Sequence, residues 1–208
     1  MNRIYIVDDD DAVRDSLLML FKSEDFNVKA FSNPLEFVAG IEKLEFGCIV
    51  LDLYMPEMSG MEVMEELKNR EITMPIICIT GHGDIPIAVK ALKMGAYDFL
   101  EKPYDSSILV EIIKRCIIEQ NSKQPLEDFT EQAKQSIASL TPREYEVLNG
   151  MVDGLRNKQI AYYMEISIRT VELHRVHVME KLDAKSLSDV LKIAIAADFD
   201  YITSTAKT

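Results

Sequence analysis

The first 103 residues alternate short apolar runs with amphipathic segments, and this alternation leaves few possible folds. The apolar runs are RIYIVD (3–8), NVKAF (27–31), CIVLDL (48–53), PIICIT (75–80) and DFLEK (98–102). Between and after them, apolar residues recur at helical spacing in 13–22, 34–44, 61–69, 86–94 and 107–118. Strands that alternate with helices predict β–α–β units with parallel strands and right-handed crossovers. Five such units predict a doubly wound α/β domain with a five-stranded parallel sheet.

The pattern changes after about residue 119. The stretch QNSKQPLEDFTEQAKQS is polar and contains Pro125, which predicts a linker whose second half can be helical. From Thr141 onward we expect four short helices, at roughly 142–153, 157–164, 168–182 and 186–197. The start and stop signals are a capping box of Thr141 and Glu144, N-caps at Asn157, Ser167 and Ser186, and a left-handed Gly154. The second part of the chain is therefore predicted to be all-α.

The net charge of −12 argues against binding to nucleic acid until its distribution is considered. Residues 1–140 hold 14 basic and 25 acidic side chains, whereas the chain from Thr141 holds nine Lys or Arg and ten Asp or Glu. Between Arg156 and Lys185 the balance is +2, from six basic and four acidic residues. The acidity belongs mostly to the first part, so DNA binding by the second part stays open.

Neither a membrane span nor a secretory signal is expected. No apolar run approaches the roughly 18 residues of a transmembrane helix, and the N-terminus MNRIYIVDDDD lacks a hydrophobic signal region. The three cysteines, Cys48, Cys78 and Cys116, are odd in number and form no CxxC pair. Free cysteines in apolar runs favour a reducing compartment, so we expect a cytoplasmic protein.

Polar side chains gather where the predicted strands end. Asp8 and Asp9 follow the first strand, Asp52 ends the third, Thr80 ends the fourth and Lys102 ends the fifth. The carboxyl ends of parallel strands share one edge of the sheet, so these groups should converge. Crowded carboxylates repel unless a cation lies between them, and oxygen ligands suit Mg²⁺. One carboxylate can then act as a nucleophile towards a phosphoryl donor, with Lys102 and Thr80 binding its oxygens.

Each of these residues alone has a simpler interpretation. An Asp run after a strand is more often a solvated loop or a helix N-cap, and Asp52 can cap the next element. The hypothesis depends on four strand ends that supply complementary groups in the right order.

The helices expected at 157–164 and from Ile168, with the turn Glu165–Ser167, have the form of a helix-turn-helix. Its small core is predicted to contain Ile160, Ala161, Met164, Ile166, Val171, Met179 and Leu182. The second helix should expose, early in its length, Arg169, Thr170, Glu172, Leu173, Arg175 and Val176. Arginines there can meet phosphates or guanine edges, and Lys158 a phosphate. Two amphipathic helices without a DNA-binding role would show the same periodicity, and His174 with His177 lacks the further ligands of a zinc site.

Residues 1 to about 120 resemble the receiver domain of response regulators. The resemblance rests on IVDDD (6–10), LDLYMPEMSGMEV (51–63), ITGHGD (79–84) and AYDFLEKPYD (96–105). It implies a flavodoxin-like sheet of order 2-1-3-4-5 and a phosphate-accepting Asp52. It also implies a Mg²⁺ ion bound by Asp9, Asp52 and the main-chain carbonyl of Tyr54, with help from Asp8.

The same resemblance assigns roles to three further residues. Thr80 and Lys102 would hold the phosphoryl oxygens, with a cis peptide between Lys102 and Pro103. Phe99 occupies the aromatic switch position of the family, although a core aromatic on the fifth strand would look the same.

Residues 138–198 resemble the LuxR-type helix-turn-helix, on LTPRE, GLRNKQIA and ISIRTVELHRVHVMEKL in that order. Together the two resemblances indicate a response regulator of the NarL/FixJ family, in its FixJ-like subgroup. In this family the helix-turn-helix binds half-sites on double-stranded promoter DNA as a dimer.

We therefore expect a receiver domain at 1–120, a linker at 121–137 and a DNA-binding domain at 138–208. The expected partners are a sensor histidine kinase, promoter DNA, RNA polymerase and, on phosphorylation, a second copy of the chain. Such a protein is a transcription regulator and not an enzyme, beyond slow loss of its own phosphate. Two alternatives are a protein–protein adaptor that lacks DNA binding and a Mg²⁺-dependent phosphatase.

Overall fold

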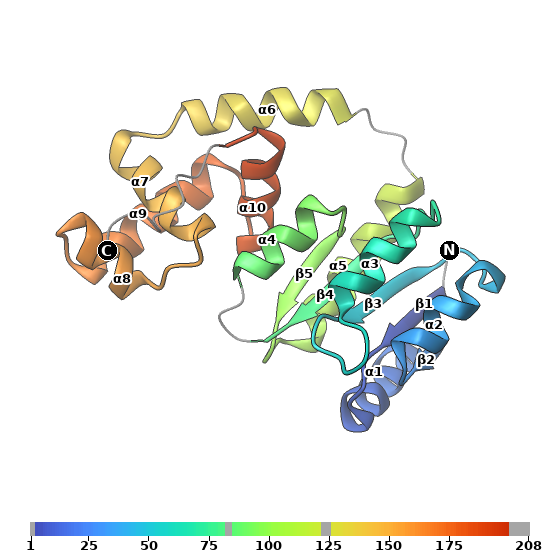
Figure 1. Cartoon of the computed structure of the whole chain (residues 1–208). Coiled ribbons are helices and arrows are strands. Elements are labelled where there is room, and N and C mark those ends of the chain that lie inside the picture. The colour runs from blue at the N-terminus through green and yellow to red at the C-terminus, as the bar shows by residue number, and fades with distance from the viewer. Residues whose placement is uncertain (1–2, 82–84, 122–125, 200–208) are drawn as a thin grey trace. The chain divides into compact units, whose positions relative to one another are not determined.

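The first part of the chain forms a five-stranded parallel sheet of order β2-β1-β3-β4-β5, which confirms the expected α/β fold and strand order (Figure 1). The structure is a computed structural model that describes residues 3–81, 85–121 and 126–199. The strands are β1 (Arg3–Val7), β2 (Asn27–Phe31), β3 (Cys48–Asp52), β4 (Ile76–Thr80) and β5 (Asp98–Glu101). Central strands β3 and β4 are buried along their whole length, which explains why they read as continuous apolar runs.

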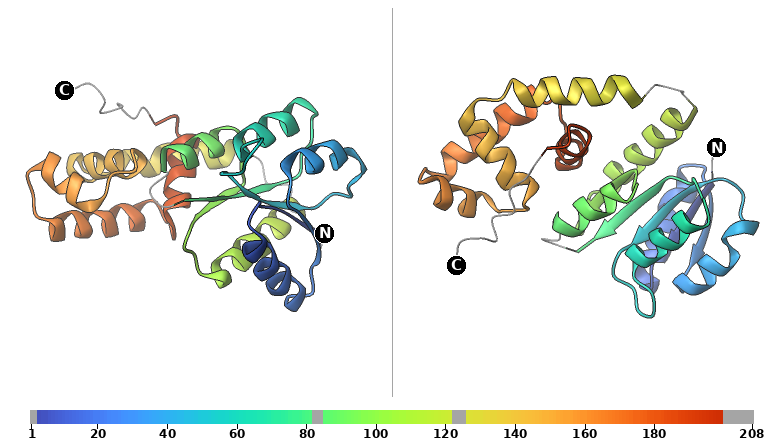
Figure 2. Two further views of the ribbon diagram at one scale, coloured as in Figure 1. Left: turned by 60° about the horizontal axis from the view of Figure 1, so that its bottom comes forward. Right: turned by 45° about the horizontal axis from the view of Figure 1, so that its top comes forward.

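Helices cover both faces of the sheet (Figure 2). On one face, α1 (Asp11–Ser23) and α5 (Ser106–Asn121) pack on the strands, and their buried side chains share a core with Ile4, Ile6, Val50 and Ile77. On the other face lie α2 (Pro34–Gly40), the short 3-10 helix η1 (Ile41–Lys43) and α3 (Gly60–Asn69). Helix α4 (Ile85–Lys93) follows β4.

Among the helices whose boundaries differ from the sequence expectation, α1 and α2 differ for a local reason. Helix α1 begins at Asp11 because the Asp10 carboxylate caps it, accepting from the backbone N of Ala12 (2.8 Å) and of Val13 (3.2 Å). The single helix expected at 34–44 ends at Gly40 and continues only as η1, since glycine is a poor helix former. The cap interpretation of the aspartate run therefore holds for Asp10.

The residues that the structure describes from Leu126 to Phe199 form five further helices, in a second compact unit. They are α6 (Leu126–Ala138), α7 (Pro142–Val152), α8 (Asn157–Met164), α9 (Ile168–Lys181) and α10 (Leu187–Ala196). Helix α6 occupies most of the segment expected to be a linker, and it packs against α10. Its Ala133 and Ile137, one helical turn apart, are both buried. This short apolar stripe lies within a polar segment, which is why the sequence pattern understated the helix.

The predicted caps of this unit are confirmed except for one. Thr141 and Glu144 form a capping box, and the hydroxyls of Ser167 and Ser186 accept from the backbone three residues later. The prediction for Asn157 was wrong, because Arg156 is the N-cap of α8. Its backbone N donates to Oε1 of Gln159 at 2.9 Å.

The core of the second unit contains most of the residues expected there. Ile160, Ala161, Val171 and Leu182 are buried, whereas Met164, Ile166 and Met179 are only half-buried. The core also takes Val178 of α9 and side chains from α7 and α10, among them Val147, Leu148 and Leu191. No helix in the described part of the chain is both long and apolar enough to cross a bilayer.

Glu144 ties the start of α7 to the end of α9. Its side chain is buried, and Oε2 accepts from the backbone N of Thr141 at 2.8 Å and from Nζ of Lys181 at 2.7 Å. These bonds, the one from Lys181 first, lower the pKa of Glu144 to about 2. Because the pKa in the unfolded chain is higher, ionised Glu144 stabilises the folded unit above pH ~4.5.

Gly60 lets the segment that follows β3 return to the end of that strand. Its backbone N donates to the carbonyl O of Leu53 at 3.1 Å. A Cβ at this position would lie 2.3 Å from the carbonyl O of Asp52 and 2.8 Å from Cα of Leu53. Both neighbours are backbone atoms, so they cannot rotate away.

Replacing Gly60 by alanine is expected to lower the free energy of unfolding by about 3 kcal/mol, the upper range for overpacking. Gly40→Ala is the matched control, because a Cβ there meets nothing within 4 Å. The control should be neutral or stabilised by up to about 1 kcal/mol. Urea unfolding curves of the three proteins measure both effects, and equal midpoints for Gly60→Ala and wild type would contradict the assignment.

Replacing Glu144 by glutamine is expected to destabilise the second unit by about 2 kcal/mol at pH 7. The difference should shrink as the pH falls below ~4.5 and disappear towards pH 2, where Glu144 itself becomes protonated. Amide hydrogen exchange of α7 and α9, compared at equal pH, measures it. Glu146→Gln is the control, since its ion pair with Arg143 is exposed and should contribute less than about 0.5 kcal/mol. A gap that stays constant from pH 7 to 2.5 would refute the role of ionised Glu144.

Candidate functional site

Three carboxylates converge at the edge of the sheet where β1 and β3 end. Asp8, Asp9 and Asp52 each place one oxygen so that all three lie within 4.8 Å of one another. Asp8 is 1% exposed and Asp52 is 6% exposed, whereas Asp9 faces solvent. An oxygen-only donor set of this kind fits a hard divalent cation. The sequence prediction that these strand ends meet is confirmed by the sheet order.

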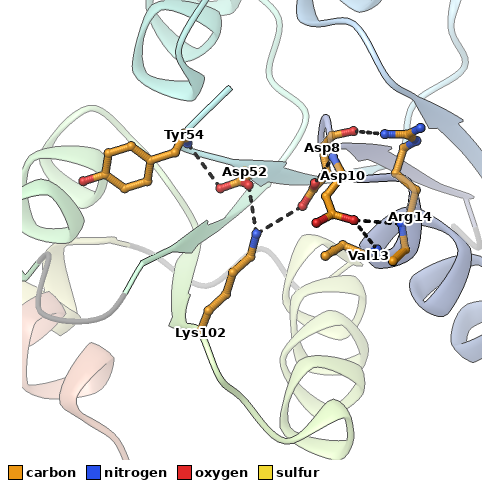
Figure 3. A network of polar contacts seen from close by, with 8 residues as sticks. Asp8, Asp10, Val13, Arg14, Asp52, Tyr54 and Lys102 are labelled. Atoms are coloured by element: carbon orange, nitrogen blue, oxygen red, sulfur yellow. Dashed lines mark hydrogen bonds and ion pairs between the residues drawn. The ribbon is translucent and has the colours of Figure 1, made fainter. Parts of the chain in front are cut away.

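Lys102 bridges two of the carboxylates. Its Nζ donates to Oδ2 of Asp52 at 2.8 Å and to Oδ2 of Asp8 at 3.3 Å (Figure 3). Burial by itself would lower the pKa of Lys102, but its bond to Asp52 and the charges of Asp52 and Asp8 outweigh burial and raise the pKa. The ammonium therefore stays charged and offsets part of the repulsion between the acids.

Asp8 is held by the segment that leads into α1. Its Oδ1 accepts from the backbone N of Asp10 at 2.9 Å, and its carbonyl O accepts from Nη1 of Arg14 at 2.7 Å. Burial raises the pKa of Asp8, and the bond from Asp10 and the charge of Lys102 oppose this only in part. Arg14 was not among the expected site residues, because an arginine on a helix gives no signal that it reaches back to a strand end.

Asp52 is oriented by its own backbone and by the lysine. Its Oδ1 accepts from the backbone N of Tyr54 at 3.2 Å, while Oδ2 is bound to Lys102. The Tyr54 ring is half exposed, beside the site in Figure 3. Gly60, which was not among the expected site residues, lets the start of α3 lie directly against the backbone of Asp52. In the sequence, this close approach could have been inferred only from the position of the glycine directly after Ser59, the N-cap of α3.

Thr80 brings a hydroxyl with unused hydrogen-bonding capacity to the same edge. The residue is fully buried, and its Oγ1 has no hydrogen-bond partner among the described residues. Its carbonyl O accepts from the backbone N of Lys102 at 2.8 Å, which joins the ends of β4 and β5. The expected cis peptide between Lys102 and Pro103 is present. Phe99 is buried on β5, and residues 82–84 of the motif ITGHGD lie outside the described residues.

The second unit presents a set of exposed side chains on α8 and α9. Lys158, Arg169, Glu172, Leu173 and Val176 are exposed, as expected. Two residues differ: Arg175 is half-buried, and half-buried Thr170 shares a hydrogen bond with Ser167, 2.7 Å between hydroxyl oxygens. Nδ1 of His177 lies 3.8 Å from Glu144, and among the described residues neither His174 nor His177 belongs to a possible metal cluster.

Comparisons with known families match both units. Residues 4–114 match the family described as "Response regulator receiver domain", and residues 138–194 match "Bacterial regulatory proteins, luxR family". The receiver match alone covers more than half of the chain. The two matches lie where the acidic site and the helix-turn-helix lie.

Similar proteins share the whole arrangement. The "Transcriptional regulatory protein FixJ" of Bradyrhizobium diazoefficiens is 41% identical over 194 residues, which cover 93% of this chain and 95% of the relative. The "Response regulator protein TmoT" of Ectopseudomonas mendocina is 41% identical over 191 residues, 91% of this chain and 86% of the relative.

A solved structure agrees with these relatives. The crystal structure of full-length FixJ from B. japonicum has a TM-score of 0.56 and 40% identity, and the match covers 95% of this chain and 97% of that one. This chain therefore belongs to the response regulators of the NarL/FixJ family, DNA-binding transcription regulators that join a receiver domain to a LuxR-type helix-turn-helix.

Proposed function

We propose that Asp52 accepts a phosphoryl group from a sensor histidine kinase and thereby controls how the LuxR-type domain binds promoter DNA. The observation that carries this proposal is the convergence of Asp8, Asp9, Asp52 and Lys102 at one sheet edge. In this proposal the receiver domain spans residues 1–120 and the DNA-binding domain 138–208. The segment 121–137 connects them, and its helix α6 extends the second unit. The two family matches support this division, and we place the protein in the cytoplasm.

In the proposed reaction, a carboxylate oxygen of Asp52 attacks the phosphorus of a phosphohistidine. An oxygen–phosphorus bond forms as the phosphorus–nitrogen bond breaks, and the imidazole leaves with the electron pair and takes up a proton. The product is an acyl phosphate on Asp52. Lys102, which binds Asp52 here, then binds a phosphoryl oxygen in the same place.

Mg²⁺ fits the site because three carboxylate oxygens lie close together with no nitrogen or sulfur donor among them. Asp8, Asp9, Asp52 and the main-chain carbonyl of Tyr54 would hold the ion. When bound, it supplies positive charge that stabilises the transferring phosphoryl group.

Thr80 and Phe99 are the proposed switch residues. The buried Oγ1 of Thr80 gains an acceptor when a phosphoryl oxygen is placed beside it, and this hydrogen bond favours the phosphorylated arrangement. An aromatic switch that moves inward would start from an exposed ring. Phe99 is already buried in this structure, so the arrangement described here is not that starting point. The change would reach the surface formed by α4, β5 and α5 as a shift between two populations.

The DNA interface is assigned to α8 and α9. Lys158, Arg169 and Arg175 would bind phosphates or guanine edges, while Thr170, Glu172, Leu173 and Val176 would face the base pairs. The local charge of +2 is modest, so one copy should bind weakly. A homodimer formed on phosphorylation would add a second set of contacts. RNA polymerase is the further partner proposed for a transcription regulator.

Asp52→Asn is expected to abolish the stimulation of DNA binding by a small phosphodonor such as acetyl phosphate. The amide cannot form the acyl phosphate, while the fold should persist because the side chain keeps its shape. Electrophoretic mobility shifts of full-length protein with and without the donor measure the effect. Asp15→Asn, an exposed aspartate of α1, is the control that should respond like wild type. Undiminished stimulation in Asp52→Asn would refute the mechanism.

Asp9→Ala is expected to weaken Mg²⁺ binding at least ten-fold, since an anionic oxygen is lost from the cluster. Isothermal titration of full-length protein with MgCl₂ measures the affinity. Asp11→Ala serves as the control, because Asp11 is a neighbouring exposed aspartate that pairs with Arg14 and lies outside the cluster. Equal affinities in Asp9→Ala and wild type would remove Asp9 from the metal site.

Lys158→Ala and Arg175→Ala separate a DNA-binding regulator from an adaptor. Each is expected to weaken DNA binding and to reduce the slope of log K against log salt by about one, the value for one lost phosphate contact. Lys134→Ala, which removes an exposed cation from α6, should leave the slope unchanged. A protein whose interaction with DNA is indifferent to both substitutions would be an adaptor.

A further inference from the structure

The outward face of α9 is unusually apolar for a helix expected to meet DNA. At 100° per residue, Val171, Val178 and Leu182 fall on one side of the helix, and these three are buried. Val176 falls opposite them, with Glu172, Arg169 and Leu173 around it. Val176 is 52% exposed and Leu173 is 55% exposed. Helix α9 therefore carries apolar side chains on both its buried and its exposed sides.

The charged side chains of α9 are arranged around this apolar pair. Glu172 lies next to Val176 on the outward face and is exposed. Arg175 points towards the flank of the helix, where it is half-buried. Basic side chains at the flank can reach the phosphate backbone while the centre of the face meets base edges. The centre thus combines two apolar side chains, Leu173 and Val176, with the carboxylate of Glu172. The exposed side chain of Arg169 lies beside them, about 20° from Val176 around the helix.

This composition restricts what the centre can recognise in a major groove. A carboxylate accepts hydrogen bonds only, so it pairs with the amino group of cytosine and is repelled by the acceptor edge of guanine. Branched apolar side chains contact the C5 methyl group of thymine favourably. A basic contact to a phosphate or a guanine edge can come from Arg169, one turn before Leu173.

We propose that Leu173 and Val176 read thymine methyl groups and that Glu172 reads a neighbouring cytosine amino group. The proposal rests on the DNA-binding function proposed above and specifies the chemistry of the half-site. Phosphate contacts then position α9, and contacts to methyl and amino groups add to the preference among sequences beside any contact that Arg169 makes.

The test removes methyl groups from the DNA and leaves the protein intact. Duplexes are first selected from a randomised pool with full-length protein in the presence of beryllofluoride. The selected duplex is then synthesised with deoxyuridine in place of each thymine in turn, which deletes only the C5 methyl. We expect wild-type affinity to fall about four-fold at one or two positions, the effect of losing one buried methyl group.

Protein variants assign each methyl group to a side chain. Leu173→Ala or Val176→Ala should bind the thymine and uracil duplexes equally at the position that it reads. Glu172→Ala should lose about ten-fold discrimination at one cytosine–guanine pair. Tyr163→Ala, at an exposed aromatic residue of α8, is the control and should retain the full uracil effect.

Three outcomes would overturn the proposal. Uracil substitution without effect on wild-type protein would exclude methyl contacts, whatever the variants do. A uracil effect that persists unchanged in both Leu173→Ala and Val176→Ala would assign the methyl groups to other side chains. Failure to select any duplex, with or without beryllofluoride, would instead contradict the DNA-binding function itself and this proposal with it.

Discussion

Repulsion between carboxylates at the end of the sheet is the constraint on which the receiver depends. Asp8 and Asp52 are both nearly buried, and Asp9 brings a third oxygen within 4.8 Å. Such a group is tolerated only with positive charge beside it. Lys102 supplies one charge through its bonds to Asp8 and Asp52, and a divalent cation would supply more. A site that needs added positive charge is also suited to hold a transferring phosphoryl group, because the same charges stabilise both.

A lysine–carboxylate pair has a different role in each of the two units. Lys102 binds two carboxylates, those of Asp8 and Asp52, and so offsets charge at the acidic site. The Glu144 side chain is 6% exposed. It accepts hydrogen bonds from the backbone N of Thr141, at the start of α7, and from Nζ of Lys181, at the end of α9. Its function is structural, since it holds α7 and α9 together and so keeps the outward face of α9 in place. The two pairs are similarly exposed, so their different roles come from their further partners: a second carboxylate for Lys102 and the backbone N of Thr141 for Glu144.

Charge distribution reconciles an acidic protein with DNA binding. The acidic excess resides mostly in the receiver, which includes the cluster of Asp8, Asp9 and Asp52, while the stretch from Arg156 to Lys185 is weakly basic. A weak phosphate term leaves more of the selectivity to contacts at the base edges. Leu173, Val176 and Glu172, together with Arg169, are exposed on α9, and we propose them for these contacts. In the proposed interface, the modest charge of this stretch limits the phosphate contacts, and the apolar side chains of α9 contribute contacts to the bases.

The sequence by itself determined the strand–helix alternation, the helix caps at Thr141, Ser167 and Ser186, and the set of acids at the strand ends. These features depend on interactions within a few residues or on the shared edge of parallel strands. Only the tertiary structure decided that Lys102 bonds to both Asp8 and Asp52, that Gly60 abuts the backbone of Asp52, and that α6 packs on α10. It also showed Thr170 engaged with Ser167 and α8 capped at Arg156 rather than Asn157. Contacts between segments far apart depend on side-chain reach and packing, whose partners no local periodicity specifies.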